Sequence, residues 1–120
     1  MILIDTSVWI DHLRHSEAGL VECLKDGAVL THPLVIEELA CGNLSKSKEI
    51  LDLLGALPPA PRADHEEILD FIANERLAGS GLGAVDAHLL ASARLAHAKI
   101  WSKDKALTLV AKKLDLLYRH

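Results

Sequence analysis

The stretch ILIDTSVWI, residues 2–10, decides the fold of this chain. Its first three residues, 2–4, are apolar and mostly β-branched, and they stop at the carboxylate of Asp5, which predicts a short buried strand. Thr6 or Ser7 then supplies the N-cap of a helix, because the apolar residues that follow recur at helical spacing. A buried strand that turns into a helix is typical of an α/β fold, and the lone charge at this turn calls for an explanation.

Short apolar runs and helical patterns alternate along the rest of the chain. Further strands are expected at 28–31, at 99–102 and at 114–118, and the extended, proline-rich segment 57–63 has room for a short edge strand. Helical patterns are found at about 20–27, 33–42, 45–54, 64–77, 85–96 and 105–113. Such alternation is the signature of βαβ units with right-handed crossovers. The predicted fold is therefore a three-layer α/β/α sandwich with a mostly parallel central sheet.

Length and composition indicate one domain, residues 1–120. Half of the 120 residues are apolar, which is enough to bury a core. Because no apolar run approaches the roughly 18 residues that span a bilayer and the amino terminus lacks signal-peptide order, a cytoplasmic protein that does not enter the membrane is expected. Cys23 and Cys41 lie in helical apolar patterns, which favours free thiols in the core over a disulfide.

Charge is distributed unevenly along the chain. The net charge is −4, but residues 1–80 hold 6 of the 13 basic and 14 of the 17 acidic residues, so the first two thirds carry −8 and the last third +4. The basic residues of the last third either line a phosphate-binding face or lie on solvated helix faces, and both interpretations stay open. They are Arg94, Lys99, Lys103, Lys105, Lys112, Lys113 and Arg119.

Four acidic residues fall where strands end and helices begin. Asp5 and Asp104 follow predicted strands, Glu38 lies on the helix after the second strand, and Asp86 starts the helix after a glycine-rich turn. Ligands of open parallel sheets bind outside the carboxyl ends of the strands, so these acids are expected to meet at one edge. Each acid taken singly also fits a helix cap, a helix dipole or a solvated surface.

Four carboxylates at one sheet edge repel one another unless a cation lies among them. Ligands that are all oxygen favour Mg²⁺ or Mn²⁺ over zinc. Such a site activates a water and stabilises charge that develops on a phosphate, which predicts metal-assisted hydrolysis of phosphodiester bonds.

Four strings together resemble the motifs of PIN-domain nucleases, and most closely those of the small VapC-type ribonuclease toxins of toxin-antitoxin pairs. The resemblance extends from residue 2 to about residue 107, and its most specific parts are D-T-S before a helix and S-x-D after a strand. A family aromatic residue a few positions after the last acid is replaced by Leu107, which concerns packing more than chemistry. The strings are ILIDTSVWID at 2–11, IEELACGN at 36–43, GLGAVDAHLLASA at 81–93 and IWSKDKAL at 100–107.

The resemblance implies a role for each residue of these motifs. It implies an acidic quartet in which Asp5, Asp86 and Asp104 hold Mg²⁺ or Mn²⁺, Glu38 holds the metal or its activated water, and two hydroxyls lie near the metal. Those hydroxyls belong to Ser7 and Ser102.

The resemblance also implies partners and a substrate. They are an RNA substrate, a second copy of the chain in a homodimer, and a VapB-type antitoxin. The antitoxin is expected to lie in an apolar groove, for which the leucines of 45–54 are candidates, and to place a basic residue next to the acids. Glu37 is expected to be solvated, because neighbours on a helix point roughly 100° apart and only Glu38 fits the motif.

Three other functions share part of the pattern. A phosphoacceptor receiver domain needs an acid pair after the first strand and an acceptor Asp that ends the third, whereas Asp52 here lies within a helical pattern. A haloacid-dehalogenase-type phosphatase needs a second Asp where this chain has Ser7. A PIN-like module that binds RNA or protein without cutting is the remaining alternative.

The histidines His12, His15 and His88 lack a third ligand in motif and are interpreted as surface or structural residues.

Overall fold

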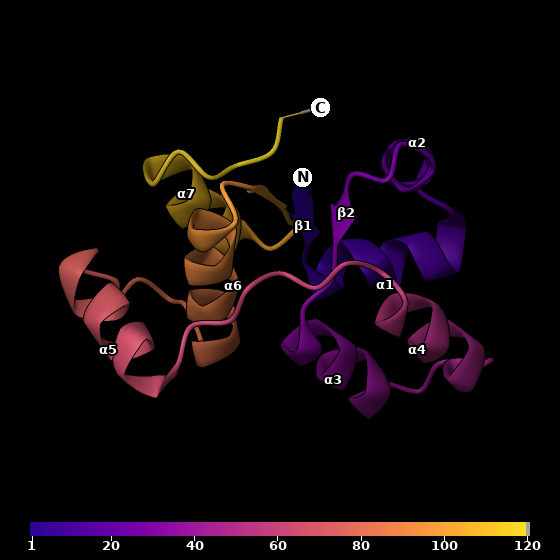
Figure 1. The fold of residues 1–120 in the computed structure, drawn as a ribbon, viewed down its shortest axis with the longest axis horizontal. Helices are drawn as coiled ribbons and strands as arrows, with labels where there is room; N and C mark the ends of the chain where they lie inside the picture. Colours follow the sequence, from indigo (N-terminus) through magenta and orange to yellow (C-terminus); the bar gives the residue numbers. More distant parts are fainter. Residues whose placement is uncertain (120) are drawn as a thin grey trace.

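A computed structural model describes residues 1–119 of the chain. Three short strands alternate with seven helices in this part, as Figure 1 shows. The elements are β1 (Ile2–Ile4), α1 (Thr6–His15), α2 (Ala18–Lys25), β2 (Val29–Leu30), α3 (Pro33–Cys41), α4 (Ser47–Gly55), α5 (His65–Asn74), α6 (Ala84–Leu95), β3 (Lys99–Trp101) and α7 (Lys105–Lys113).

The three strands form one parallel sheet in the order β2-β1-β3. Leu3 of the central strand pairs with Leu30 on one side and with Ile100 on the other, and neither Leu3 nor Ile100 is exposed at all. A parallel sheet is buried on both faces, which explains why its strands are continuous apolar runs. The predicted mostly parallel sheet is confirmed.

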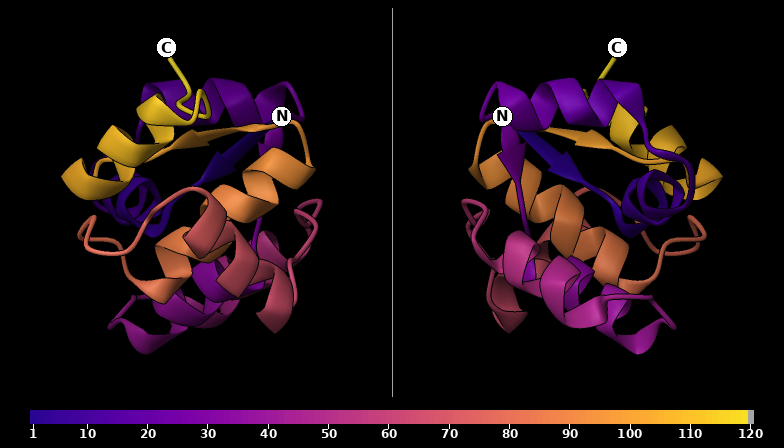
Figure 2. Two further views of the ribbon diagram at one scale, coloured as in Figure 1. Left: turned by 90° about the vertical axis from the view of Figure 1, so that its left-hand side faces the viewer. Right: turned by 90° about the vertical axis from the view of Figure 1, so that its right-hand side faces the viewer.

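Helices cover both faces of this sheet. In the two side views of Figure 2, α2 and α7 lie over one face, while α6 lies against the other. Helix α5 packs on α6, whereas α3 packs on α1 and α4 packs on α3. Leu89 and Leu90 of α6 and Leu107 of α7 are fully buried, so the core extends through both faces of the sheet. The three-layer α/β/α sandwich is therefore confirmed.

The strand order places the first motif at the centre of the molecule. Because β1 lies between β2 and β3, its carboxyl end is flanked by the ends of both neighbours. The backbone N–H of Asp5 donates to the carbonyl of Trp101 at 2.9 Å, which extends the pairing of β1 and β3 by one residue. Asp5 thus lies at the carboxyl edge of the central strand, beside the loop that leads into α7.

Two predicted strands are wrong. Segment 114–118 makes one bridge, Ile100 to Leu117, and segment 57–63 makes one bridge, Pro59 to Thr31. Neither becomes a strand, because each segment is bridged to the sheet at a single residue rather than at several in succession. The segments lie along opposite edges of the three-stranded sheet and cover them, which protects edges that would otherwise pair with other chains.

Other local predictions are corrected as well. The N-cap of α1 is Asp5 rather than Thr6 or Ser7, because both hydroxyls bind side chains of the site. Helix α5 ends at Asn74 rather than near 77, and Leu77 is buried beyond its end. Cys41 is exposed at the end of α3, although both cysteines are free as expected. Within residues 1–119 no helix is long and apolar enough to cross a bilayer.

His32 is a buried polar residue that joins α3 to α6. Its Nδ1 accepts from the N–H of Leu34 at 3.1 Å, so it caps α3, and its Nε2 lies 3.1 Å from the hydroxyl of Ser92. Both His32 and Ser92 are fully buried. Burial, followed by the nearby charges of His88 and Arg62, lowers the pKa of His32 to about 4. The imidazole is therefore neutral at physiological pH, with its proton on Nε2.

This burial predicts a stability that depends on pH. The pKa of His32 is lower in the folded chain than in the unfolded chain, so protons favour unfolding as the pH falls from about 6.5 to about 4. The His32 contribution lost over this window is roughly 3 kcal/mol. Urea unfolding at pH 4.5, 5.5 and 7 should show this decline in the wild type. In His32→Asn the decline should be smaller, and an unchanged pH slope in that variant would contradict the assignment.

Candidate active site

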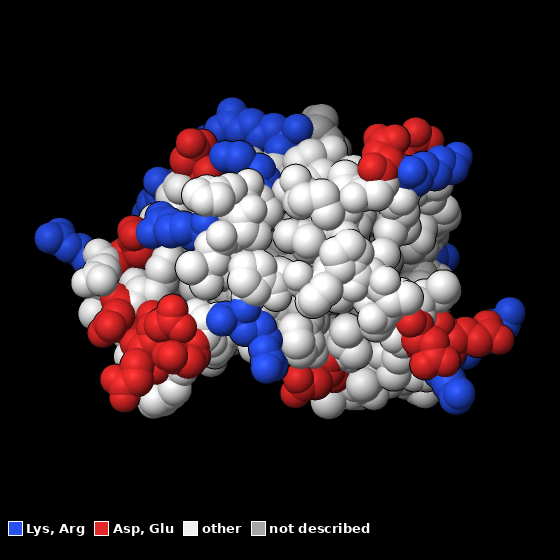
Figure 3. All heavy atoms as spheres, viewed as in Figure 1, with Lys and Arg blue, Asp and Glu red and all other residues white. Residues whose placement is uncertain are grey.

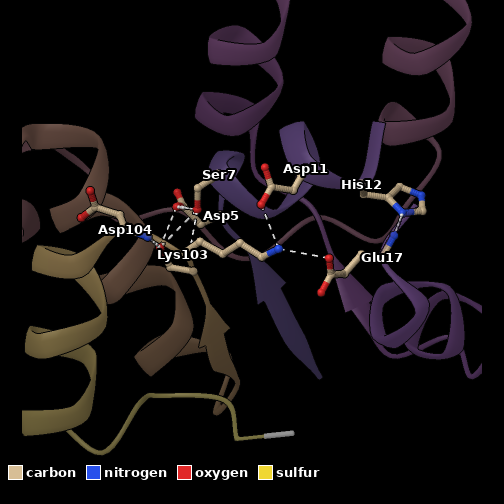
Figure 4. A network of polar contacts seen from close by, with 8 residues as sticks. Asp5, Ser7, Asp11, His12, Glu17, Lys103 and Asp104 are labelled. Atoms are coloured by element: carbon tan, nitrogen blue, oxygen red, sulfur yellow. Dashed lines mark hydrogen bonds and ion pairs between the residues drawn. The ribbon is translucent and has the colours of Figure 1, made fainter. Parts of the chain in front are cut away.

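Asp5 presents a buried carboxylate at the carboxyl edge of the sheet, and only 6% of the residue is exposed. Two hydroxyls donate to the same oxygen, Oδ2, from Ser7 at 2.6 Å and from Ser102 at 2.8 Å (Figure 4). A charge this deeply buried requires hydrogen bonds to replace its water, and charge-assisted bonds are the strongest available. The expected neighbourhood of Asp5, Ser7 and Ser102 is therefore present, with both hydroxyls bound to the acid.

The loop between β3 and α7 is attached to Asp5 through these serines. The N–H of Lys103 donates to the hydroxyl of Ser7, and the N–H of Asp104 donates to the hydroxyl of Ser102, each at 2.9 Å. Asp104 then caps α7, because its Oδ2 accepts from the N–H of Leu107 at 2.8 Å. Asp104 thus caps a helix and also belongs to the group of acids, so the two interpretations of this residue are compatible.

Glu38 reaches the site from α3. Its Oε1 accepts from the hydroxyl of Thr6 at 2.6 Å, and this bond joins α3 to the first residue of α1. Glu37 is exposed and has neither a hydrogen bond nor an ion pair from its side chain within residues 1–119, as expected. Sequence reasoning considered Thr6 only as a cap, although its place in the D-T-S string was a signal that it serves the site.

Asp86 completes the group of acids from the first turn of α6. Its Oδ2 accepts from the N–H of Gly83 at 3.3 Å. Burial raises the pKa of Asp86 above its usual value, and the negative charges of Asp5, Asp104 and Glu38 raise it further. All four predicted acids therefore lie close enough to interact electrostatically, although they come from four different parts of the chain.

The oxygens of these carboxylates are suited to a hard cation. Each acid commits one oxygen to a protein donor, and the second oxygen has no hydrogen-bond partner among residues 1–119. Four free carboxylate oxygens are the donor set that Mg²⁺ and Mn²⁺ prefer. In the same residues no group of three Asp, Glu, His or Cys side chains is arranged to hold a metal ion as it stands. The assignment of Asp5, Asp86 and Asp104 as metal ligands therefore stays a prediction. The chemical type of their oxygens agrees with it.

Lys103 connects the site to the end of α1. Its ammonium lies 2.9 Å from Asp11 and 3.0 Å from Glu17, so it fixes the loop after β3 to α1 and to the start of α2 (Figure 4). This ion pair lowers the pKa of Asp11 and raises that of Lys103. Close to it, Nδ1 of His12 accepts from the N–H of Glu17 at 3.0 Å, which agrees with a structural role for this histidine. The only signal in the sequence for this role of Lys103 was its position between the motif residues Ser102 and Asp104.

The basic residues of the last third divide into two groups. Arg94, Lys99 and Lys103 pair with carboxylates. The others have no carboxylate partner within 4.0 Å among residues 1–119, and Figure 3 shows basic atoms gathered over α7 and the chain that follows it. A phosphate-binding face at α7 stays a prediction. These unpaired residues are Lys105, Lys112, Lys113 and Arg119.

Comparison with known families decides the identity of the fold. A family model described as "PIN domain" matches residues 2–113, which is nearly the whole chain. The chain belongs to the PIN domain family. This membership excludes the receiver-domain and haloacid-dehalogenase alternatives, which are families of their own.

Named relatives of this PIN domain come from Mycobacterium tuberculosis. Ribonuclease VapC32 from strain CDC 1551 / Oshkosh is 52% identical over 108 residues, which cover 89% of this chain and 87% of the relative. Ribonuclease VapC32 from strain ATCC 25618 / H37Rv gives the same values. The family match over residues 2–113 includes all four acids of the site.

The repulsion in the PIN domain site predicts that Asp86 destabilises the metal-free protein. A folded pKa above the unfolded value means that the ionised form costs stability at neutral pH, and that this cost disappears as the pH falls and Asp86 protonates. Asp86→Asn keeps the acceptor for Gly83 and removes the charge. With a chelator at pH 7 it should stabilise the protein by on the order of 1 kcal/mol, or a few degrees in Tm.

Differential scanning calorimetry at pH 7 and pH 4 measures this effect. Asp70→Asn, a change at an exposed acid of α5, serves as the control for a general gain from lower net charge. A Tm that falls in Asp86→Asn, or that rises equally in both variants, would contradict repulsion within the site.

Proposed function

We propose that this PIN domain is a metal-dependent endoribonuclease and the toxin of a toxin-antitoxin pair. The observation that supports the proposal is that Asp5, Glu38 and Asp104 lie close enough to Asp86 to interact with it electrostatically, while each of the four acids keeps one carboxylate oxygen without a protein donor among residues 1–119. The name of the 52% identical relatives, Ribonuclease VapC32, supports RNA as the substrate. Natural proteins retain mutually repelling charges of this kind where activity requires them.

Each residue has a role in the proposed reaction. Asp5, Asp86 and Asp104 hold Mg²⁺ or Mn²⁺, and Glu38 holds the metal or the attacking water. The bound metal supplies the activation of water and the neutralisation of charge on the phosphate. Ser7 and Ser102 hold Oδ2 of Asp5, so its Oδ1 is fixed toward the ligand.

The remaining contacts of the site position the other acids. Thr6 holds Oε1 of Glu38, and the cap at the start of α7 fixes the carboxylate of Asp104. These bonds fix the carboxylates through protein contacts alone, and such preorganisation lowers the cost of assembling the site. No side chain is required as a covalent nucleophile, so the expected product ends are a 5′-phosphate and a 3′-hydroxyl.

A pair of neighbouring variants tests the nuclease proposal. Glu38→Gln should lower the cleavage rate about 100-fold, because it removes a charge from the site. Glu37→Gln changes an exposed neighbour on the same helix and should leave the rate within about twofold of wild type. Labelled single-stranded and structured RNA, incubated with Mg²⁺, Mn²⁺ or chelator, gives the rates and the product ends on a gel.

The outcome of this assay separates the proposed activity from its alternative. Cleavage that continues in chelator, or that leaves a 2′,3′-cyclic phosphate, would overturn the metal-dependent mechanism. Tight binding of RNA with no cleavage of any RNA in either metal would favour the PIN-like binding module. Asp5→Asn should abolish cleavage as well, with its circular dichroism spectrum checked because Asp5 is buried.

The proposed antitoxin has a candidate docking surface, which we call the α4 groove. It is a hollow of about 220 Å³ between α1, α2 and α4. Leu53 is 70% exposed there, as predicted for a leucine of 45–54. An apolar groove of this kind accepts the apolar face of an amphipathic helix. The α4 groove is lined by Trp9, His12, Leu13, Leu24, Ile50, Leu53, Leu54 and Leu57.

A charge placed in the α4 groove tests this part of the proposal. Leu53→Asp should weaken binding of the VapB-type antitoxin at least tenfold, because an unpaired carboxylate then faces an apolar partner. Leu109→Asp is the matched control, since Leu109 is 55% exposed on α7, away from the groove. Isothermal titration calorimetry gives both affinities, and equal affinities for the two variants would exclude the groove as the antitoxin site.

The homodimer and the cytoplasmic location belong to the same proposal. Both follow from the VapC-type resemblance and from the sequence pattern. Sedimentation of the purified chain, with and without its antitoxin, measures the first.

A further inference from the structure

A hollow of about 310 Å³ lies directly beside the acidic site, and Glu38 forms part of its wall. The hollow extends between α1, α3 and the turn that follows α3. Leu39 is buried in its wall, and Leu13 and Ile50 are half-buried there. We call it the Glu38 hollow. Five of its ten lining residues are apolar and four carry polar or charged side chains, a mixture that fits a flat organic group with a polar edge.

The polar residues of the Glu38 hollow are available to a ligand. Arg14, Asn43 and Ser45 line it, and all three are exposed. None of their side chains makes a hydrogen bond or an ion pair within residues 1–119. A guanidinium plane stacks on flat rings, and an amide both donates and accepts hydrogen bonds at the edge of such a ring. Apolar side chains that contact the face of a ring, together with free polar groups that bind its edge, suit a site that recognises a small ring.

We propose that the Glu38 hollow is a nucleobase subsite, which receives one unpaired base of the RNA next to the phosphate that is cut. The inference rests on the proposed ribonuclease function. Arg14 stacks on the base, and Asn43 reads its hydrogen-bonding edge. Sequence-specific recognition of RNA uses unpaired bases in this way, stacked on aromatic or guanidinium planes and bonded along their edges.

The charge and composition of the hollow favour a base over a phosphate. The carboxylate of Glu38 repels a phosphate, whereas the edges of bases carry amino groups that donate to acids. No aromatic residue lines the hollow, and the whole chain has four. Aromatic stacking is tolerant of sequence because every base has a π-face, so a hollow without it discriminates through edge contacts and shape. The subsite therefore sets the sequence preference of cleavage.

Cleavage of a randomised RNA pool tests this assignment. Sequencing of the product ends gives the base preference at each position around the cut for the wild type, Asn43→Ala and Arg14→Met. At one position next to the cut, the ratio between the best and the worst base should fall about tenfold in Asn43→Ala. The same ratio should fall in Arg14→Met. Lys48→Met, which removes an equal charge from an exposed position outside the hollow, should leave the preference unchanged.

A binding experiment separates this inference from the proposed function. The four nucleoside 5′-monophosphates are titrated into the wild-type protein in chelator, and NMR follows the amides of residues 42–45. Shifts confined to these residues and to Arg14, in the order of the cleavage preference, support the subsite. If shifts confined to these residues differ among the four bases while the wild type cleaves no RNA, the subsite stands and the nuclease proposal fails.

Two results would overturn the subsite. One is specific cleavage with a base preference that neither Asn43→Ala nor Arg14→Met changes. The other is binding of all four monophosphates with shifts outside the hollow. In both cases the nuclease proposal survives, and the hollow belongs to another ligand such as a peptide side chain.

Discussion

The hydrogen bonds between the carboxylate of Asp5 and two serine hydroxyls are the constraint on which the rest of the site depends. Ser7 lies in the first turn of α1 and Ser102 follows β3, so two segments 95 residues apart meet on one oxygen of Asp5. The same hydroxyls accept from the backbone of Lys103 and Asp104, which fixes the start of α7. A buried charge thus organises the loop that carries the last acid of the site.

The acids of the site oppose the stability of the fold. The core consists mostly of leucine, isoleucine, valine and alanine, with Trp9 and Trp101 buried among them. Against this core the charges of Asp5, Glu38 and Asp104 raise the pKa of Asp86. Capping bonds and serine hydroxyls offset part of the repulsion. In the proposed function a bound cation offsets the remainder, so metal binding and stability are expected to be linked.

The order of elements and the four acids were predictable from the sequence because they depend on short-range patterns. Helix α7 has the predicted bounds, 105–113, because its N-cap, Asp104, lies directly before it in the sequence. The strand at 114–118 was mispredicted, because an apolar run at a sheet edge does not reveal how many ladder bonds it makes.

Contacts between distant parts of the chain escaped prediction altogether. The bond of His32 to Ser92 spans 60 residues, and the ion pairs of Lys103 span 86 and 92. Nothing in the local pattern distinguishes these residues from ordinary surface histidines and lysines. The exposure of Cys41 is a similar case. The apolar periodicity of the helix predicts that Cys41 is buried, but it is the last residue of α3, where the helix face is open to solvent.

The α4 groove and the Glu38 hollow have a common wall. Leu13 and Ile50 line both of them, one from α1 and the other from α4. A side chain that inserts between these helices displaces the same two residues that form the apolar wall beside Glu38. The shape of the space next to the acids is therefore not independent of what occupies the outer groove. A ligand in the outer groove is therefore able to alter the space beside the acids without contacting any carboxylate.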